Sequence, residues 1–167
     1  MINQISSNTY QLYFNEFGSC VYLLKLKKED KQQNILIDTS SKDNEQELIN
    51  NLRQLSINPE DINIILLTHS HWDHIGNIKL FENAKLYDYN NKNEMSKDFP
   101  EIKVIETPGH TKDSLCFLYK DILFSGDTLF HNGIGKTDFK ESLPNKMQSS
   151  LNKLKNLKYK ILCPGHV

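Results

Sequence analysis

The sequence is poor in cysteine, has no excess charge of one sign and lacks a long apolar run. Its 167 residues include three cysteines (Cys20, Cys116 and Cys163), an odd number without a close pair. This excludes a disulfide framework and a thiolate zinc motif, and is typical of buried, reduced thiols. Twenty basic and 21 acidic side chains give a net charge of −1, which argues against a nucleic-acid binder.

The amino-acid sequence also shows no membrane-spanning segment and no export signal. The longest apolar runs, such as residues 64–67, are far shorter than the roughly 20 residues that a membrane-spanning helix needs. The first 19 residues have neither the basic start nor the apolar core of a secretory signal. We therefore expect a cytoplasmic protein with no nucleic-acid or membrane partner.

What is present is a series of short apolar segments that predict strands and two helices. Apolar steps of three and four residues predict helices over 43–55 and 144–157, the first capped by Ser41 or Asp43. A short helix is expected near His74. The predicted strands cover residues 9–14, 20–26, 34–38, 63–68, 85–87, 103–107, 114–119, 122–125 and 159–163.

The order of these elements predicts the fold class. The polar residues 27–33 are expected to form a hairpin loop, and Lys120-Asp121 a tight turn. Two groups of strands, each followed by helices, favour a mixed α/β (α+β) fold with two sheets packed face to face and helices outside. At this length, residues 1–167 are expected to form a single domain.

Residues 68–74 contain three histidines and an aspartate directly after the apolar segment 63–68. His69 and His71 are two residues apart, so in extended backbone they point the same way and can share one metal ion. Asp73 and His74 lie beyond, where the chain must turn, and are better placed for a second ion. Imidazole and carboxylate ligands suit zinc, iron or manganese rather than calcium or magnesium.

Three later segments repeat one pattern, in which a predicted strand runs into a turn with glycine before a possible ligand. These ligands are His110, Asp127 and His166. Glycine lets the backbone turn sharply and approach a bound ion closely. Each segment alone is weak evidence, but together they supply enough donors for two coordination shells.

These residues resemble the metallo-β-lactamase-fold hydrolase superfamily, whose HxHxDH signature is met by residues 69–74. The resemblance covers essentially the whole chain and implies a four-layer αββα sandwich. It implies a first ion on His69, His71 and His110, and a second on Asp73, His74 and His166, with Asp127 bridging the two. Asp38 resembles the carboxylate that orients a ligand histidine in this family.

Within the superfamily the chain is most similar to glyoxalase II (hydroxyacylglutathione hydrolase). The residues that carry this similarity are 107–111, 126–130 and the glycine loop 133–139. It implies hydrolysis of a small-molecule thioester, such as an S-acylglutathione, by a metal-bound hydroxide between two divalent ions. Zinc is the first candidate for these ions, and iron or manganese would also suit the ligands. Asp73 and Asp127 are the candidate catalytic carboxylates. True β-lactamases of this fold usually lack the bridging aspartate, which disfavours antibiotic hydrolysis.

Two side chains and two other functions stay open in the sequence. Lys136 either pairs with a substrate carboxylate or is a solvated lysine, and His131 is expected at the rim or surface. The glycine loop also resembles persulfide dioxygenases, whose single iron would here use His69, His110 and Asp127. A metal-binding module without turnover is the third, less favoured interpretation, because the ligand set is intact.

Overall fold

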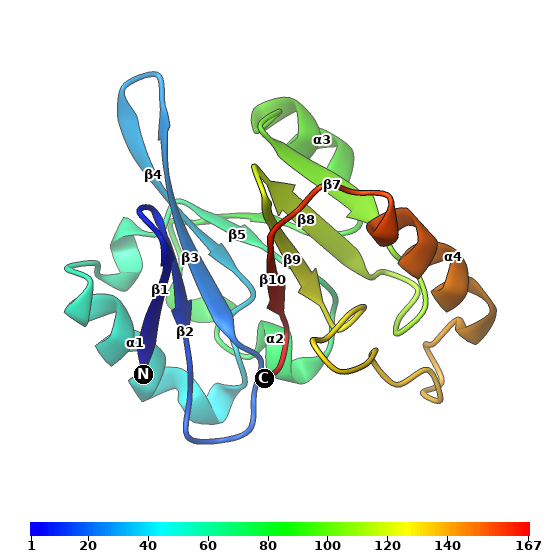
Figure 1. Ribbon diagram of the computed structural model, residues 1–167. Helices are drawn as coiled ribbons and strands as arrows, with labels where there is room; N and C mark the ends of the chain where they lie inside the picture. Colours follow the sequence, from blue (N-terminus) through cyan, green and yellow to red (C-terminus); the bar gives the residue numbers. More distant parts are fainter. The chain divides into compact units, whose positions relative to one another are not determined.

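The computed structural model describes all 167 residues, and the chain divides into two compact units (Figure 1). Unit 1 comprises Met1–Leu67 and His71–Tyr87, and unit 2 comprises Thr68–Ser70 and Asp88–Val167. Each unit contains one β-sheet and two α-helices. The chain is thus of mixed α/β class with two sheets, as the sequence predicts, and it contains four α-helices.

Unit 1 is built on a six-stranded sheet in the order β1-β2-β3-β4-β5-β6. The strands are β1 (Ile2–Ser6), β2 (Thr9–Leu12), β3 (Val21–Lys28), β4 (Lys31–Ile37), β5 (Ile64–Leu66) and β6 (Lys85–Tyr87). Neighbours from β1 to β4 are antiparallel, whereas β4, β5 and β6 are parallel. The parallel strands end in the buried residues Ile37, Leu66 and Tyr87, and the chain leaving β5 continues into the predicted metal motif.

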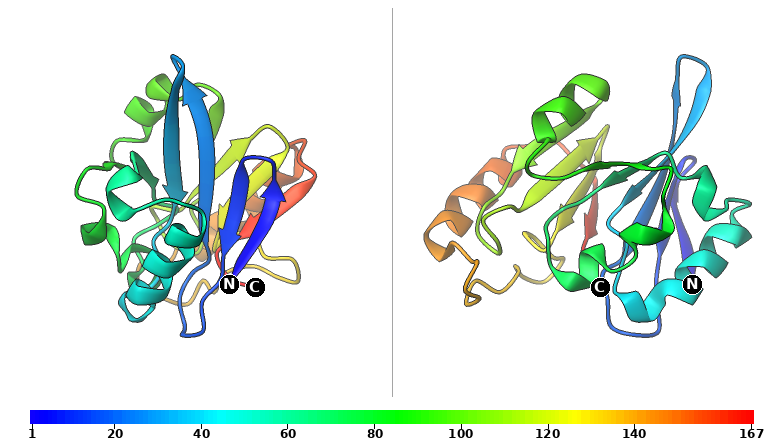
Figure 2. Two further views of the ribbon diagram at one scale, coloured as in Figure 1. Left: turned by 90° about the vertical axis from the view of Figure 1, so that its left-hand side faces the viewer. Right: turned by 180° about the vertical axis from the view of Figure 1, so that it is seen from behind.

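Helix α1 (Glu45–Gln54) covers one face of this sheet (Figure 2). Its Leu48 and Leu52 are fully buried in one apolar cluster with alternate residues of the strands, among them Leu23. This packing stabilises the helix, because no side chain caps it: the predicted cap Ser41 donates its hydroxyl to the Phe17 carbonyl instead (2.6 Å). The cap prediction is therefore wrong, although the helix prediction is correct to within two residues.

Unit 2 contains a four-stranded sheet in the order β10-β9-β8-β7. The strands are β7 (Ile102–Glu106), β8 (Leu115–Tyr119), β9 (Ile122–Gly126) and β10 (Ile161–Pro164), of which only the β9–β10 pair is parallel. The helices are α3 (Lys92–Asp98) and α4 (Pro144–Lys155). Leu154 of α4 packs in one cluster with Ile105, Cys116 and Leu123 of three strands, so α4 covers one face of this sheet.

One local expectation is corrected, and two elements are missing from the prediction. Residues 27–33 form no loop: β3 and β4 extend through them to a two-residue turn in which Glu29 and Asp30 have φ of 50° and 63°. Positive φ at both central residues matches the right-handed twist of a two-residue hairpin, so the polar residues on either side pair within β3 and β4. Strand β1 and helix α3 are not foreseen, because α3 buries only Met95 and β1 is a half-exposed edge.

Two structural findings concern the cysteines and the apolar segments noted from composition. All three cysteines are buried and unbridged, as predicted. No α-helix combines the length and the apolarity that crossing a bilayer would require.

Candidate metal centre

Unit 2 brings together four of the predicted ligands at the ends of its strands. His110 follows β7, Asp127 follows β9 and His166 follows β10, while His69 is held beside β8 by the bond from the Leu115 N–H to the Thr68 carbonyl (2.7 Å). Asp127 Oδ2 lies 3.6 Å from His110 Nε2 and 3.4 Å from His166 Nε2. A ligand nitrogen of His69 lies within 4.8 Å of His110 and of Asp127. One carboxylate is thus surrounded by three imidazoles.

The spacing of these donors fits a divalent metal ion. For metal–ligand bonds of about 2.0–2.2 Å in tetrahedral geometry, two ligand atoms are separated by about 3.4 Å. The two nitrogen–oxygen distances to Asp127, 3.6 Å and 3.4 Å, match that edge length. Neutral imidazole nitrogens and a carboxylate oxygen are also the donors that zinc, iron and manganese accept. The residues present therefore fit such an ion.

Hydrogen bonds fix which ring nitrogen of His110 is available as a ligand. Its Nδ1 lies 2.7 Å from the backbone carbonyl of Lys136, which can only accept, so Nδ1 carries the proton and donates. The lone pair is then on Nε2, the atom that lies closest to Asp127. The Thr68 hydroxyl contacts His69 Nδ1 at 3.1 Å in a similar position. Such outer contacts set the tautomer and orientation of metal-binding histidines.

Close backbone approaches place the ligand loops of unit 2. Gly126 has φ of +49°, and a Cβ there would lie 2.6 Å from Cβ of Thr68, so β9 can end beside His69 only with glycine at this position. A Cβ on Gly135 would collide with the Asp127 carbonyl and approach His110 Nδ1. The loop that carries His110 is tied to the start of α4 by the Ser142 hydroxyl, which donates to the His110 carbonyl at 2.6 Å.

Unit 1 holds the other predicted ligands on the short helix α2 (Trp72–Ile75) and its cap His71. His74 Nδ1 donates to Asp38 Oδ2 at 2.8 Å, and both side chains are buried. The proton on Nδ1 leaves the Nε2 lone pair available to a metal ion, and the buried carboxylate raises the basicity of the ring. A carboxylate oxygen of Asp73 lies within 4.8 Å of a ring nitrogen of His74.

Helix α2 is braced by the segment that follows β4. The Thr39 hydroxyl and N–H both donate to the His74 carbonyl, at 2.9 and 2.8 Å. Asn77 Nδ2 donates to the carbonyls of Thr39 (2.8 Å) and Ser41 (2.7 Å). The sequence predicts Ser41 only as a helix cap and indicates no role for Thr39 and Asn77; the run of small polar residues after Asp38 is the only signal for this bracing. Because α2 has a single turn, helix propensity does not hold His74 in place. The hydrogen bonds of this bracing hold it instead.

Lys136 and His131 are placed differently from the ligands. The Lys136 side chain is exposed, and the residue contributes to the centre through its backbone carbonyl, a role that no side-chain pattern indicates. His131 is exposed at the rim of a cavity that His166 also lines.

The fold, the donor set and its outer contacts define a metallo-β-lactamase-type protein, and comparison with known families agrees. Residues 15–86 and 91–166 match the Metallo-beta-lactamase superfamily. The chain belongs to this superfamily of metal-dependent hydrolases, and the predicted fold is confirmed.

Two curated relatives are similar to this chain. A probable metallo-hydrolase, MJ0296 of Methanocaldococcus jannaschii, is 38% identical over 79% of this chain and 70% of its own length. A hydroxyacylglutathione hydrolase of Francisella tularensis subsp. novicida is 33% identical over 77% of this chain, but the match spans only 56% of that enzyme.

Two solved structures agree in fold at low sequence identity. The metallo-β-lactamase family protein TTHA1429 of Thermus thermophilus superposes with a TM-score of 0.80 at 18% identity, covering 98% of this chain and 75% of that one. ETHE1 of Myxococcus xanthus gives a TM-score of 0.72 at 24% identity, covering 94% and 74%. At these identities the likeness concerns the fold alone.

Proposed function

We propose that this protein hydrolyses small-molecule acyl thioesters, such as an S-acylglutathione, to an acid and a thiol. The observation that carries the proposal is the position of the Asp127 carboxylate, within 3.6 Å of ring nitrogens of both His110 and His166. A carboxylate in this position is suited to bridge two ions. The 33% identity to a hydroxyacylglutathione hydrolase supports the thioester class.

The proposed ligands are His69, His110, Asp127 and His166 of unit 2, with His71, Asp73 and His74 added by the HxHxDH motif. Zinc is the first candidate metal, and iron and manganese suit the same donors. Bound divalent ions would lower the pKa of a coordinated water and polarise the substrate carbonyl.

The chain's own side chains prepare this chemistry in three ways. The Nδ1 atoms of His110 and His74 donate to a carbonyl and a carboxylate, which fixes each ring's orientation and leaves Nε2 for a ligand role. Asp127 supplies negative charge where the imidazoles supply none. Asp73 is buried next to His74. We propose that its carboxylate accepts a hydrogen bond from the attacking water and thereby orients it.

The same proposal covers partners and compartment. The substrate is a small molecule, with neither nucleic acid nor membrane involved, since the charges are balanced. Three buried, reduced cysteines fit a cytoplasmic location.

The test compares metal-loaded and metal-free protein on a panel of acyl thioesters, with thiol release as the readout and elemental analysis of both samples. We expect hydrolysis only in the loaded sample, with up to two ions per chain. Equal rates in both samples, or no thioester hydrolysed by protein that holds its metal, would contradict the proposal.

A persulfide dioxygenase is the second candidate, favoured by one observation. In unit 2, His69 and His110 lie within 4.8 Å of each other, and each is close to Asp127, a two-histidine, one-carboxylate set that suits non-haem iron. One iron per chain and oxygen uptake with glutathione persulfide would support this candidate against the hydrolase.

A further inference from the structure

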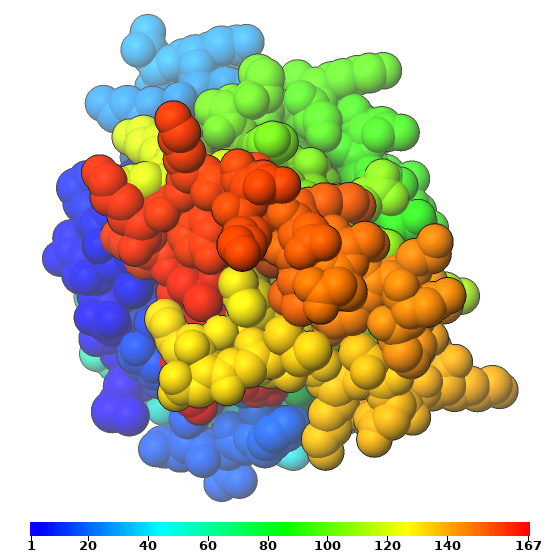
Figure 3. Space-filling view, turned by 45° about the vertical axis from the view of Figure 1, so that its right-hand side comes forward, coloured from blue at the N-terminus to red at the C-terminus, as the bar shows by residue number.

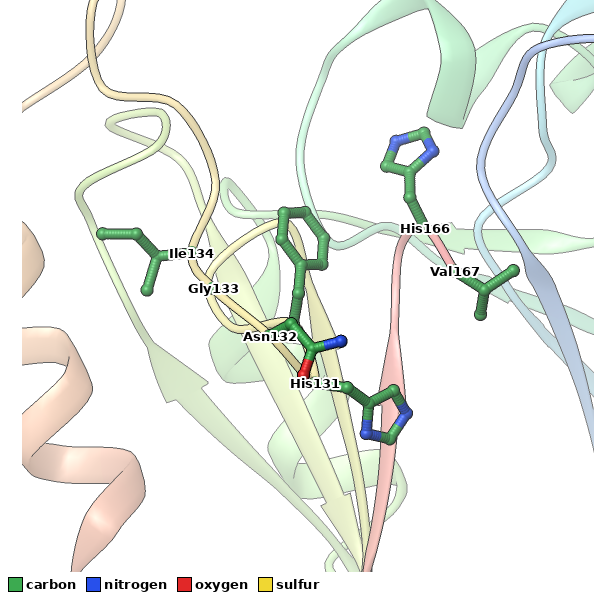
Figure 4. Close-up of a pocket in the computed structure, with 7 residues that line it drawn as sticks. His131, Asn132, Gly133, Ile134, His166 and Val167 are labelled. Carbon is green, nitrogen blue, oxygen red and sulfur yellow. The ribbon is translucent and has the colours of Figure 1, made fainter.

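Unit 2 contains a cavity of about 480 Å³ beside His166 (Figure 4). One wall is a turn from Phe130 to Gly133, closed by the hydrogen bond from the Phe130 N–H to the Gly133 carbonyl (2.8 Å). In the space-filling view of Figure 3 this segment (yellow) lies on the surface beside the last residues of the chain (red). The cavity is therefore a defined, accessible feature next to a proposed metal ligand.

The lining changes in chemistry from one end of the cavity to the other. Figure 4 shows Ile134 and Val167 on opposite sides, with His166 above and the side chains of His131 and Asn132 below. The Phe130 ring meets the His166 ring edge to face, with 6.2 Å between centroids. An apolar section thus separates the ligand histidine from two side chains that can donate hydrogen bonds.

The volume is informative about what the cavity can hold. Ligand sites are typically 300–1,000 Å³, and this cavity falls in that range. A three-carbon hydroxyacyl group would occupy on the order of 150 Å³, at about 30 Å³ per non-hydrogen atom, the volume of one water. Such a group is small compared with this volume.

We propose that this cavity binds the acyl group of the substrate and selects acyl groups with a bulky apolar body and a hydrogen-bonding substituent at the far end. The inference rests on the proposed thioester hydrolysis, because it assigns the carbonyl end to His166. Phe130 and Ile134 contact the apolar body, and His131 and Asn132 receive the polar substituent. An arylacetyl group with a ring hydroxyl has this shape and chemistry.

The first experiment measures kcat/KM of the metal-loaded protein on three thioesters of one thiol, N-acetylcysteamine, with acetyl, phenylacetyl and 4-hydroxyphenylacetyl groups. We expect phenylacetyl to exceed acetyl by at least tenfold and the hydroxyl to add a further gain. Ile134→Ala should lower the phenylacetyl-to-acetyl ratio about tenfold, and Asn132→Ala should remove the gain from the hydroxyl.

Leu143→Ala is the matched control, since Leu143 is an exposed aliphatic side chain of the same unit outside the cavity. It should leave all three rates unchanged. Ile134 is 46% exposed, so its truncation is not expected to prevent folding.

A second measurement separates this inference from the proposed function. Calorimetric titration of the metal-loaded protein with the product acid, 4-hydroxyphenylacetate, should show binding that Ile134→Ala weakens about tenfold. Such binding without hydrolysis of any thioester would support the cavity and overturn the proposed function. Hydrolysis with equal acyl preference in wild type and Ile134→Ala, and no binding of the acid, would overturn the cavity assignment alone.

Discussion

The two units hold their candidate metal ligands by different means. In unit 1, His71, Asp73 and His74 are consecutive or nearly so, and one short helix carries them. In unit 2, His69, His110, Asp127 and His166 are spread over almost a hundred positions and meet only because strand ends meet.

The outer contacts differ accordingly. His74 is supported by a buried carboxylate and a braced backbone segment, whereas His110 is supported by a backbone carbonyl and glycine-dependent close approaches. Unit 1 should therefore be sensitive to loss of side-chain hydrogen bonds. Unit 2 should be more sensitive to changes in Asp127, the one carboxylate among its candidate ligands, and in its glycines.

The largest effect is expected from Asp127→Ala. It removes the only carboxylate among the unit 2 donors, so metal content should fall and thioester hydrolysis should drop more than about 100-fold, beyond the effect of losing an outer partner of a ligand. Elemental analysis and thiol release are the measurements. Asp121→Ala, which removes a half-exposed carboxylate of the same unit, is the control. Wild-type turnover in the Asp127 variant would rule out the proposed centre.

Asp38→Asn tests the carboxylate of unit 1. Asparagine tolerates the φ of 59° at this position, and its amide oxygen can still accept from His74 but without charge. Metal affinity should fall about 10–100-fold. Competition with a metal chelator measures this, with the exposed Asp43→Asn as control. Unchanged affinity would mean that the Asp38–His74 pair serves stability alone.

Asn77→Ala tests the bracing of α2. It leaves the buried carbonyls of Thr39 and Ser41 without their bonds to this side chain, at a cost on the order of 1–3 kcal/mol. Urea denaturation should show the loss. Asn83→Ala removes a weaker, exposed bond to the Glu60 carbonyl and should cost far less. Equal losses in the two variants would argue against a special role for the brace.

The smallest effect concerns Cys116 in the core of unit 2. Burial raises the pKa of its thiol from 9.0 to about 11. The pKa of this thiol is higher in the folded than in the unfolded protein. The stability that its burial as a neutral thiol contributes is therefore complete below about pH 9 and is lost as pH rises toward 11. Mass spectrometry should find Cys116 unalkylated in native protein at pH 8 and alkylated in urea. Rapid native alkylation would contradict its burial.

The sequence predicts the elements of this fold wherever apolar periodicity is strong. Strand β6 is predicted with its bounds, and α4 within two residues. The prediction from sequence fails where tertiary contacts replace local signals. Strand β1 is an edge strand, and α3 has one buried side chain.

The candidate ligands show the same division. Spacing alone groups residues 69–74, while His110, Asp127 and His166 are linked only by the pattern of glycine turns after strands. The carbonyl of Lys136 and the brace from Asn77 depend on backbone geometry, which a residue pattern does not encode. Those contacts require the three-dimensional structure.

The backbone and the side chain of Lys136 have separate roles. Its main-chain oxygen accepts from the candidate ligand His110, and any amino acid carries that oxygen, while its side chain is exposed. Evolution or engineering can therefore alter the side chain here, changing charge or length at the approach to the centre, with little disturbance of the imidazole behind it.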